Sequence, residues 1–286
     1  MKVKDIITAQ KPSLSFEVFP PKTQDNFEVV SLAADKIAKL KPDFMSVTYG
    51  AGGSTSKYTL EIAKNILDTG VTPLAHLTCV CSSKESILEK LEQFKANGIE
   101  NILALRGDIP QGEDPDSWDF KYASELVAFI KEHGDFCIGG ACYPEKHVES
   151  VTERADLEYL KFKVNTGCDF LTTQMFFDND AFYKYLLRVR AKGINVPIIP
   201  GVMPLTNGNQ IKRSCQLSGA TLPDRFKRII ERFSDDPKAM EQAGIAYATE
   251  QIIDLFANGI TNVHVYSMNN PDVAAKIQAN LSDILG

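Results

Sequence analysis

The chain has 286 residues, of which 44% are hydrophobic and 24% charged, and its net charge is −6. This composition is ordinary for a globular protein, and the acidic balance argues against a nucleic-acid-binding protein. The apolar runs are too short to cross a bilayer, and Met1–Asp5 contains no apolar signal core. We therefore expect a cytoplasmic protein that is not bound to a membrane.

Eight short, nearly continuous apolar runs recur along the chain, as is typical of strands buried on both faces. Segments with apolar residues three and four positions apart lie between these runs and predict amphipathic helices. The predicted strands are Leu14–Phe19, Phe44–Tyr49, Pro73–Cys79, Asn101–Arg106, Phe136–Tyr143, Phe170–Met175, Pro197–Val202 and Val263–Met268. The predicted helices are Phe27–Leu40, Thr59–Asp68, Lys84–Asn97, Tyr122–His133, Arg154–Asn165 and Asp180–Ala191, followed by the extra helices Gln210–Leu217, Asp224–Phe233 and Lys238–Asn258.

The first seven strands recur at intervals of about thirty residues, which is the length of one strand–helix unit. This alternation predicts an α/β fold, a single (β/α)8 TIM barrel over residues 1–286 with extra helices before the last strand. An open, doubly wound sheet is the alternative. That fold usually carries a glycine-rich dinucleotide turn after an early strand, and the glycines in the run 49–54 have the wrong spacing for it.

Glu17 is the charged residue of the first predicted strand, within the run Phe16-Glu17-Val18-Phe19, which two prolines end. A carboxylate among apolar side chains is costly to ionise, so we expect Glu17 to take up a proton more readily than a surface glutamate. A glutamate of this kind can act as a general acid near neutral pH. The alternative is a strand-edge glutamate that points to water or pairs with a lysine.

Catalytic groups of such barrels come from the carboxyl ends of the strands. The polar residues at the predicted strand ends are therefore candidates, but several of them can also have a purely structural role. His76 could be a satisfied core histidine, Tyr143 a strand-end aromatic residue, and Arg106 with Asp108 a pair that closes a loop. Together they suit a polar, aromatic ligand. The polar strand-end residues are Glu17, Thr48, His76, Thr78, Arg106, Asp108, Tyr143, Gln174, Tyr266, Asn269 and Asn270.

The six cysteines do not indicate a metal site. Cys79 and Cys81 alternate along a strand, and no second pair stands at the spacing of metal ligands. The others lie mostly in apolar runs, where a free cysteine behaves as a small hydrophobic residue.

Seven ordered motifs between about Leu14 and Asn270 resemble the bacterial 5,10-methylenetetrahydrofolate reductases. They are Ser15-Phe16-Glu17-Val18-Phe19-Pro20-Pro21-Lys22-Thr23, Ser46-Val47-Thr48-Tyr49-Gly50-Ala51, His76-Leu77-Thr78-Cys79, Ala104-Leu105-Arg106-Gly107-Asp108-Ile109-Pro110, Tyr143-Pro144-Glu145-Lys146-His147, Thr173-Gln174-Met175-Phe176-Phe177-Asp178 and Ile199-Pro200-Gly201-Val202-Met203-Pro204.

The resemblance implies a flavoprotein with FAD as cofactor. Members of that family pass a hydride from NADH or NADPH to FAD, and then from the reduced flavin to 5,10-methylenetetrahydrofolate. The product, 5-methyltetrahydrofolate, is the methyl donor for methionine synthesis. Relatives form dimers or tetramers, so the resemblance also implies a homo-oligomer.

The resemblance assigns roles to individual residues as well. Glu17 would be the acid that helps to open the five-membered ring of the substrate to a 5-iminium cation. Asp108 would lie near the flavin pyrimidine and the folate, and Gln174 and Gln210 would contact the folate. The residues implied to hold FAD are Thr48, His76, Arg106, Gly107, Asp108, Ala123, Ala141, Tyr143, His147, Asp156 and Lys163.

Two positions depart from the family pattern. Asn270 stands where relatives often carry a substrate-contacting arginine, and Ser214 stands where some carry a phenylalanine that packs on nicotinamide and folate. Two alternatives to the reductase reading stay open: a subunit that takes electrons from a partner redox protein, and a pterin-binding barrel without flavin. Lys212 and Arg213 are weaker candidates for holding the glutamate tail of the folate, and a solvated helix face is the simpler reading.

Overall fold

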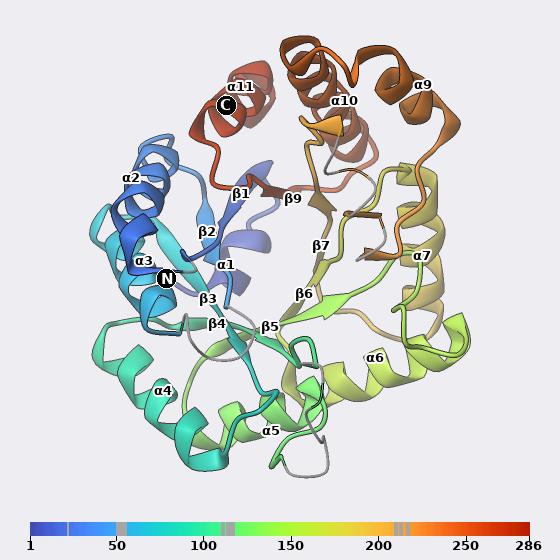
Figure 1. Ribbon diagram of the computed structural model, residues 1–286. Helices are drawn as coiled ribbons and strands as arrows, with labels where there is room; N and C mark the ends of the chain where they lie inside the picture. Colours follow the sequence, from blue (N-terminus) through green and yellow to red (C-terminus); the bar gives the residue numbers. More distant parts are fainter. Residues whose placement is uncertain are drawn as a thin grey trace.

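The computed structural model describes residues 1–21, 23–49, 56–109, 112, 118–208, 211, 214–215 and 218–286. Its strands form one parallel sheet that curves into a barrel, and the helices form a ring outside it (Figure 1). The predicted TIM barrel is confirmed. The strands are β1 (Ser13–Val18), β2 (Phe44–Val47), β3 (Thr72–Thr78), β4 (Asn101–Leu105), β5 (Cys137–Cys142), β6 (Phe170–Thr173), β7 (Ile198–Ile199), β8 (Gly201–Val202) and β9 (Asn262–Tyr266).

Helices follow most of the strands, as the apolar spacing predicts. The helices are α1 (Val3–Ile7), α2 (Phe27–Ala38), α3 (Ser56–Asp68), α4 (Lys84–Ala96), α5 (Ala123–His133), α6 (Glu153–Gly167), α7 (Asn179–Ala191), α9 (Asp224–Phe233), α10 (Pro237–Ala257), α11 (Pro271–Asn280) and α12 (Ser282–Leu285), and Gln24–Asn26 forms a 3-10 turn, η1. Two of the extra helices are thus present as α9 and α10, whereas much of the predicted helix 210–217 lies outside the described residues. Among the described helices, none combines the length and apolar character needed to span a membrane.

The seventh predicted strand is in fact two short strands, and this split closes the barrel. Ile198–Ile199 pairs with β6, whereas Gly201–Val202 pairs with β9. Pro200, between them, has no N–H to donate to a ladder, and its carbonyl accepts a hydrogen bond from His264 N at 2.9 Å. The two ends of the sheet are therefore joined through a single proline.

Gly201 is required at this closure because there is no space for a side chain. A Cβ built on Gly201 would lie 2.5 Å from Tyr266 Oη and 2.7 Å from the carbonyl oxygen of Thr173. The Gly201 N–H donates to Thr173 Oγ1 at 2.8 Å, so the backbone is fixed on both sides.

The strands place alternate residues on opposite faces of the barrel wall. On β1, Leu14, Phe16 and Val18 pack against the helices in the main core. Ser15 and Glu17 face the barrel interior, where they reach residues of β2 and β9.

The floor of the barrel, at the amino ends of the strands, is apolar and is covered by the short helix α1. Asn101 fixes this helix, since its side-chain oxygen accepts a hydrogen bond from Val3 N at 2.7 Å and its amide donates to Pro73 O at 3.1 Å. The floor cluster consists of Val3, Ile6, Ile7, Phe44, Leu74, Leu103, Cys137, Phe170 and Ile199. Sequence periodicity did not predict α1, because five residues are too few for a helical pattern.

Candidate active site

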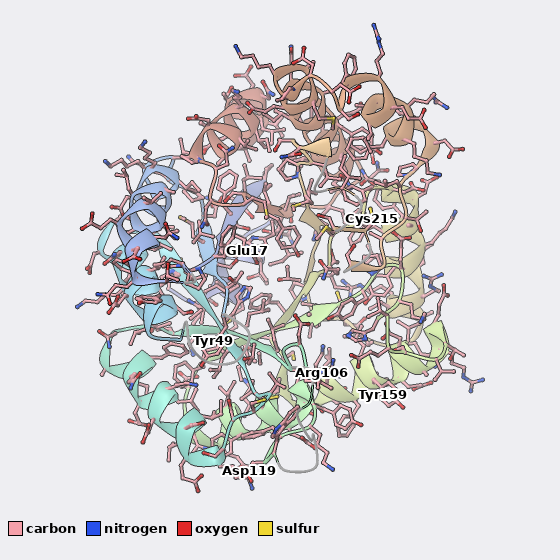
Figure 2. The ribbon with its side chains drawn as sticks, viewed as in Figure 1. Glu17, Tyr49, Arg106, Asp119, Tyr159 and Cys215 are labelled. Carbon is pink, nitrogen blue, oxygen red and sulfur yellow. The ribbon has the colours of Figure 1, made fainter. Side chains whose placement is uncertain are left out.

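Glu17 lies near the carboxyl end of β1 and faces the barrel axis (Figure 2). Its side chain is 18% exposed. The expectation that it lies among apolar side chains is wrong, because strand alternation turns Phe16 and Val18 outward to the helices. The neighbours of the Glu17 carboxylate are instead a serine and two histidines.

A hydrogen-bonded chain runs from Glu17 down into the barrel. Ser46 Oγ lies 3.3 Å from Glu17 Oε2 and 3.0 Å from His264 Nε2. His264 Nδ1 then lies 2.7 Å from Ser15 Oγ, which also reaches the carbonyl of Val263 at 3.2 Å. Hydroxyl groups can both donate and accept, and neutral imidazole has one donor and one acceptor nitrogen. This series of hydrogen bonds can therefore be completed whether the Glu17 carboxyl group is ionised or protonated.

His76 approaches Glu17 from β3. Its Nε2 lies 3.5 Å from Glu17 Oε2 and has no hydrogen-bond partner among the described residues. Burial lowers the pKa of His76 to about 4, although the Glu17 charge opposes this shift. His76 is therefore neutral at physiological pH, and it does not act as a fixed cation beside the carboxylate.

We expect this burial to make stability depend on pH. The unfolded chain takes up the His76 proton near pH 6.5, whereas the folded chain resists protonation down to about pH 4. The unfolded state thus binds more protons in this window, and stability falls as the pH drops from 6.5 to 4, by up to about 3 kcal/mol. His76→Gln should flatten this part of the profile in urea unfolding, whereas the control His133→Gln should keep it. Equal slopes for His76→Gln and the parent protein would contradict this prediction.

A second group of predicted residues gathers between β4, β5 and α6. Tyr143 and His147 pack edge to face with ring centres 4.5 Å apart. Burial lowers the pKa of His147, although the charge of Glu149 opposes this shift. Lys163 Nζ donates to the carbonyl of Ala141 at 2.5 Å. We call this group, Arg106, Ala141, Tyr143, His147, Asp156 and Lys163, the basic cradle.

Arg106 does not pair with Asp108. Its two terminal nitrogens donate to the carboxylate of Glu149 at 2.6 and 2.7 Å. Asp108 lies on the exposed loop after β4, where its charge acts on both Arg106 and Tyr143. Gly107, between them, has a φ of +91°, and a Cβ there would lie 2.7 Å from Val80.

The Glu17 group, which consists of Glu17, Ser46, His76 and His264, lies at the carboxyl-terminal mouth of the barrel together with the basic cradle. Tyr266 of β9 lies at the same mouth, where burial and then the charge of Glu17 raise its pKa well above the ordinary value. Its hydroxyl donates to the carbonyl of Thr173 at 2.5 Å. Figure 2 shows Glu17 closer to the centre of the ring than Arg106, which lies toward α5.

Other predicted residues have structural partners at the same mouth. The carbonyl of Thr48 accepts from Thr59 Oγ1 at 3.0 Å, and Gln174 Oε1 accepts from Met175 N at 2.9 Å. Asp156 accepts from Ser150 Oγ at 2.7 Å. Ala123 is the first residue of α5. The predictions for Gln210, Lys212 and Arg213 lie outside the described residues.

One of the two departures from the family pattern has a local explanation. Asn270 is the N-cap of α11, since its side-chain oxygen accepts from Asp272 N at 3.1 Å and Val273 N at 3.2 Å. The contact of Ser214 is made by its backbone carbonyl, which accepts from Ser218 Oγ at 2.8 Å, and it does not explain the serine at this position.

Sequence reasoning missed Ser15, Ser46 and His264. All three are nearly fully buried on interior faces of strands. The available signal was the spacing, because Ser15 stands two residues before Glu17 and His264 two residues before Tyr266, so each pair shares a strand face.

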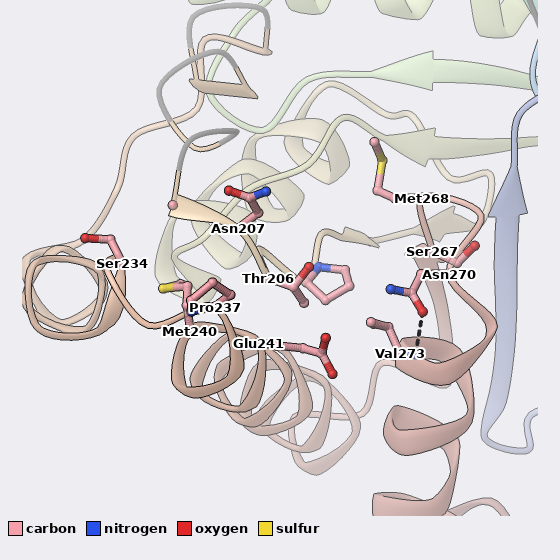
Figure 3. Close-up of a pocket in the computed structure, with 12 residues that line it drawn as sticks. Thr206, Asn207, Ser234, Pro237, Met240, Glu241, Ser267, Met268, Asn270 and Val273 are labelled. Atoms are coloured by element: carbon pink, nitrogen blue, oxygen red, sulfur yellow. Dashed lines mark hydrogen bonds between the residues drawn. The ribbon is translucent and has the colours of Figure 1, made fainter.

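A pocket of about 420 Å³ lies beside this site, between the amino ends of α10 and α11 (Figure 3). It meets the Glu17 site at Ser267, whose hydroxyl donates to the carbonyl of Glu17 at 2.6 Å. Glu241 is the charged residue of its lining, and its carboxylate is paired with Lys276 at 2.5 Å. The lining residues include Pro204, Thr206, Asn207, Gly208, Ser234, Pro237, Met240, Met268, Asn270 and Val273.

Comparison with known sequences gives a match over nearly the whole chain. The model of the methylenetetrahydrofolate reductase family matches residues 2–282. The 5,10-methylenetetrahydrofolate reductase of Escherichia coli (strain K12) is 35% identical over 266 residues, which cover 93% of this chain and 89% of that protein. Methylenetetrahydrofolate reductase (NADH) 1 of Arabidopsis thaliana is 38% identical over 98% of this chain and 50% of its own length. The chain thus spans about half the length of its plant relatives.

Comparison with solved structures supports the fold. An uncharacterised protein from Clostridium thermocellum, described as binding two copies of 5-methyl-5,6,7,8-tetrahydrofolic acid, aligns over 99% of both chains with a TM-score of 0.66. The two chains are only 16% identical, so this likeness extends to the fold alone.

Proposed function

Because the chain belongs to the methylenetetrahydrofolate reductase family, we propose that it reduces 5,10-methylenetetrahydrofolate to 5-methyltetrahydrofolate with electrons from NADH or NADPH. The proposal includes FAD as the cofactor and one flavin-binding barrel over residues 1–286. The observation that carries it is the Glu17 carboxylate at the barrel mouth, bonded to Ser46 and adjacent to a basic cradle.

The residues of the basic cradle fit an anionic, aromatic cofactor. Arg106 and Lys163 provide a planar fork and a point charge for a diphosphate. Tyr143 and His147 provide aromatic surface, and Ala141 adds only a methyl group to the wall. When bound there, FAD would supply the two-electron carrier between nicotinamide and folate. The remaining predicted contacts, Thr48, His76, Gly107, Asp108, Ala123 and Asp156, complete the proposed set.

Glu17 would give its proton to N10 of the folate. The five-membered ring of the substrate opens when the bond from the bridging carbon to N10 breaks, and the departing nitrogen needs a proton. A general acid held at the reacting atom contributes roughly a hundredfold to ten-thousandfold in rate. The Ser46 hydroxyl, at 3.3 Å, can donate to the carboxylate that this transfer leaves.

The folate ring would be oriented by Gln174. The side-chain oxygen of Gln174 is taken by Met175 N. Its amide N–H groups are therefore the part that can donate to a ring acceptor. Gln210 belongs to the same proposed set of folate contacts, and Asp108 would act on both flavin and folate through its charge.

The experiment that tests this proposal separates the two halves of the reaction. The purified protein should be yellow, lose its flavin absorption with NADH or NADPH, and regain it when 5,10-methylenetetrahydrofolate is added. A yellow protein that neither nicotinamide bleaches would favour a subunit that receives electrons from a partner protein. A colourless protein that does not take up FAD would overturn the proposal and favour a pterin-binding barrel without flavin.

A further inference from the structure

Arg106 and Glu149 form a two-point ion pair at the edge of the basic cradle. The two N–H···O bonds are parallel and short, and the third donor, Arg106 Nε, reaches the carbonyl of Gly107 at 3.2 Å. The pairing raises the pKa of Arg106 and lowers that of Glu149, so both groups are charged at neutral pH. A carboxylate thus occupies the guanidinium face that would also bind a phosphate group.

The backbone around Glu149 is firmly held, whereas its side chain is exposed. Glu149 N donates to His147 Nδ1 at 3.1 Å, and Ser150 N donates to the carbonyl of His147 at 3.0 Å. Lys146 Nζ also donates to the carbonyls of His147 and Ser150. The Glu149 side chain is 54% exposed, against 22% for Arg106. Glu149 can therefore leave Arg106 by side-chain rotation into solvent, without movement of the loop.

We propose that Glu149 competes with the diphosphate of the cofactor for Arg106, so that cofactor binding exchanges one anion for another. The inference rests on the proposed function, because it takes the cofactor to be a diphosphate such as FAD. Glu149 then sets the affinity of the protein for its cofactor. Arg106 remains paired throughout, either with Glu149 or with the diphosphate, and its charge is never left unpartnered in the cradle.

The expected effect follows from the strength of an exposed ion pair. When only a fraction of the protein has Arg106 available, the apparent dissociation constant rises by the inverse of that fraction. Because exposed pairs are weak, we expect Glu149→Gln to bind FAD roughly two- to fivefold more tightly than the parent protein. Quenching of FAD fluorescence, titrated with protein from which the flavin has been removed, measures this change.

The chain offers a closely matched control. Arg225 and Glu250 form a second two-point pair on the surface of α9 and α10, with Arg225 Nη1 2.6 Å from Glu250 Oε1. Glu250→Gln removes the same charge from a similar pair outside the cradle, so it should leave FAD affinity unchanged. If Glu149→Gln and Glu250→Gln increase the affinity for FAD equally, the increase comes from the change in net charge and not from the release of Arg106. This result would overturn the proposed exchange.

Two further measurements make the test specific. In an Arg106→Gln background, Glu149→Gln should no longer tighten binding, because there is no guanidinium to release; a retained effect would contradict the exchange. ADP, which has a diphosphate but no flavin, should also bind Glu149→Gln more tightly. If Glu149→Gln binds ADP more tightly but the protein does not take up FAD, the exchange of Glu149 for a diphosphate is supported and FAD is rejected as the cofactor. Unchanged or weaker binding of both ligands would reject the exchange and leave the proposed function intact.

Discussion

Replacing Glu17 by glutamine is expected to lower the rate of folate reduction by about a hundredfold to ten-thousandfold, and to leave flavin reduction by NADH nearly unchanged. Glutamine keeps the size of the side chain and can still bond to Ser46, but it has no proton to give at neutral pH. Only the half of the reaction that opens the folate ring should therefore suffer. Stopped-flow absorbance at the flavin band measures each half separately.

Two companion variants sharpen this test. Glu17→Asp keeps the carboxylic acid but shortens the side chain by one methylene group. A displacement of about 1 Å can itself lower the reaction rate about a hundredfold. Glu17→Asp should therefore retain part of the folate activity that Glu17→Gln loses. Glu250→Gln is the control for the loss of one carboxylate and should behave as the parent protein. Near-normal folate reduction by Glu17→Gln would show that another group provides the proton.

The second large effect is expected for Gly244→Ala, which should destabilise the protein although alanine is the better helix former. Gly244 lies inside α10 with its backbone against the segment after β8. A Cβ there would lie 2.0 Å from the carbonyl oxygen of Leu205 and 2.7 Å from its carbonyl carbon. Helix propensity favours alanine by about 1 kcal/mol. Overpacking typically costs 1–3 kcal/mol, and a clash with rigid backbone belongs at the upper end of roughly that range.

We therefore expect a net loss of about 2 kcal/mol in the free energy of unfolding for Gly244→Ala, measured by urea denaturation. Ala246→Gly, at an exposed position of the same helix, is the control. It should cost only about 1 kcal/mol through propensity. If Gly244→Ala instead stabilises the protein, α10 can move away from Leu205 at little cost.

The barrel could be predicted from the sequence because its strands and its helices each have a simple pattern of apolar residues. Strands buried on both faces appear as apolar runs, and the helices between them repeat every three to four residues. The split of the seventh predicted strand at Pro200 could not be predicted in the same way. Its two halves pair with β6 and β9, which are far apart in sequence, and only closure of the ring brings them together.

The site was partly predictable. The carboxyl ends of parallel strands meet at one rim, so Glu17, Arg106 and Tyr143 could be placed there from strand positions alone. The contacts of Glu17 could not be predicted, because they depend on register: Glu17 lies opposite Ser46 on β2 and Tyr266 on β9. Glu149 was missed for another reason. It lies in a loop of charged residues, and nothing in its neighbours indicates which cation it faces.

Helix α1 covers the amino-terminal face of the barrel, so among the described residues the carboxyl-terminal face is the side from which a ligand can approach Glu17. Under the proposed function, a nicotinamide and a folate that both reach Glu17 and the cradle would approach from this same face. Two ligands that approach from one face compete for the space in front of Glu17, and two separate half-reactions would avoid this competition. A water molecule that returns a proton to the Glu17 carboxylate would also approach from this face. A ligand bound there would therefore delay reprotonation of Glu17 until the ligand leaves.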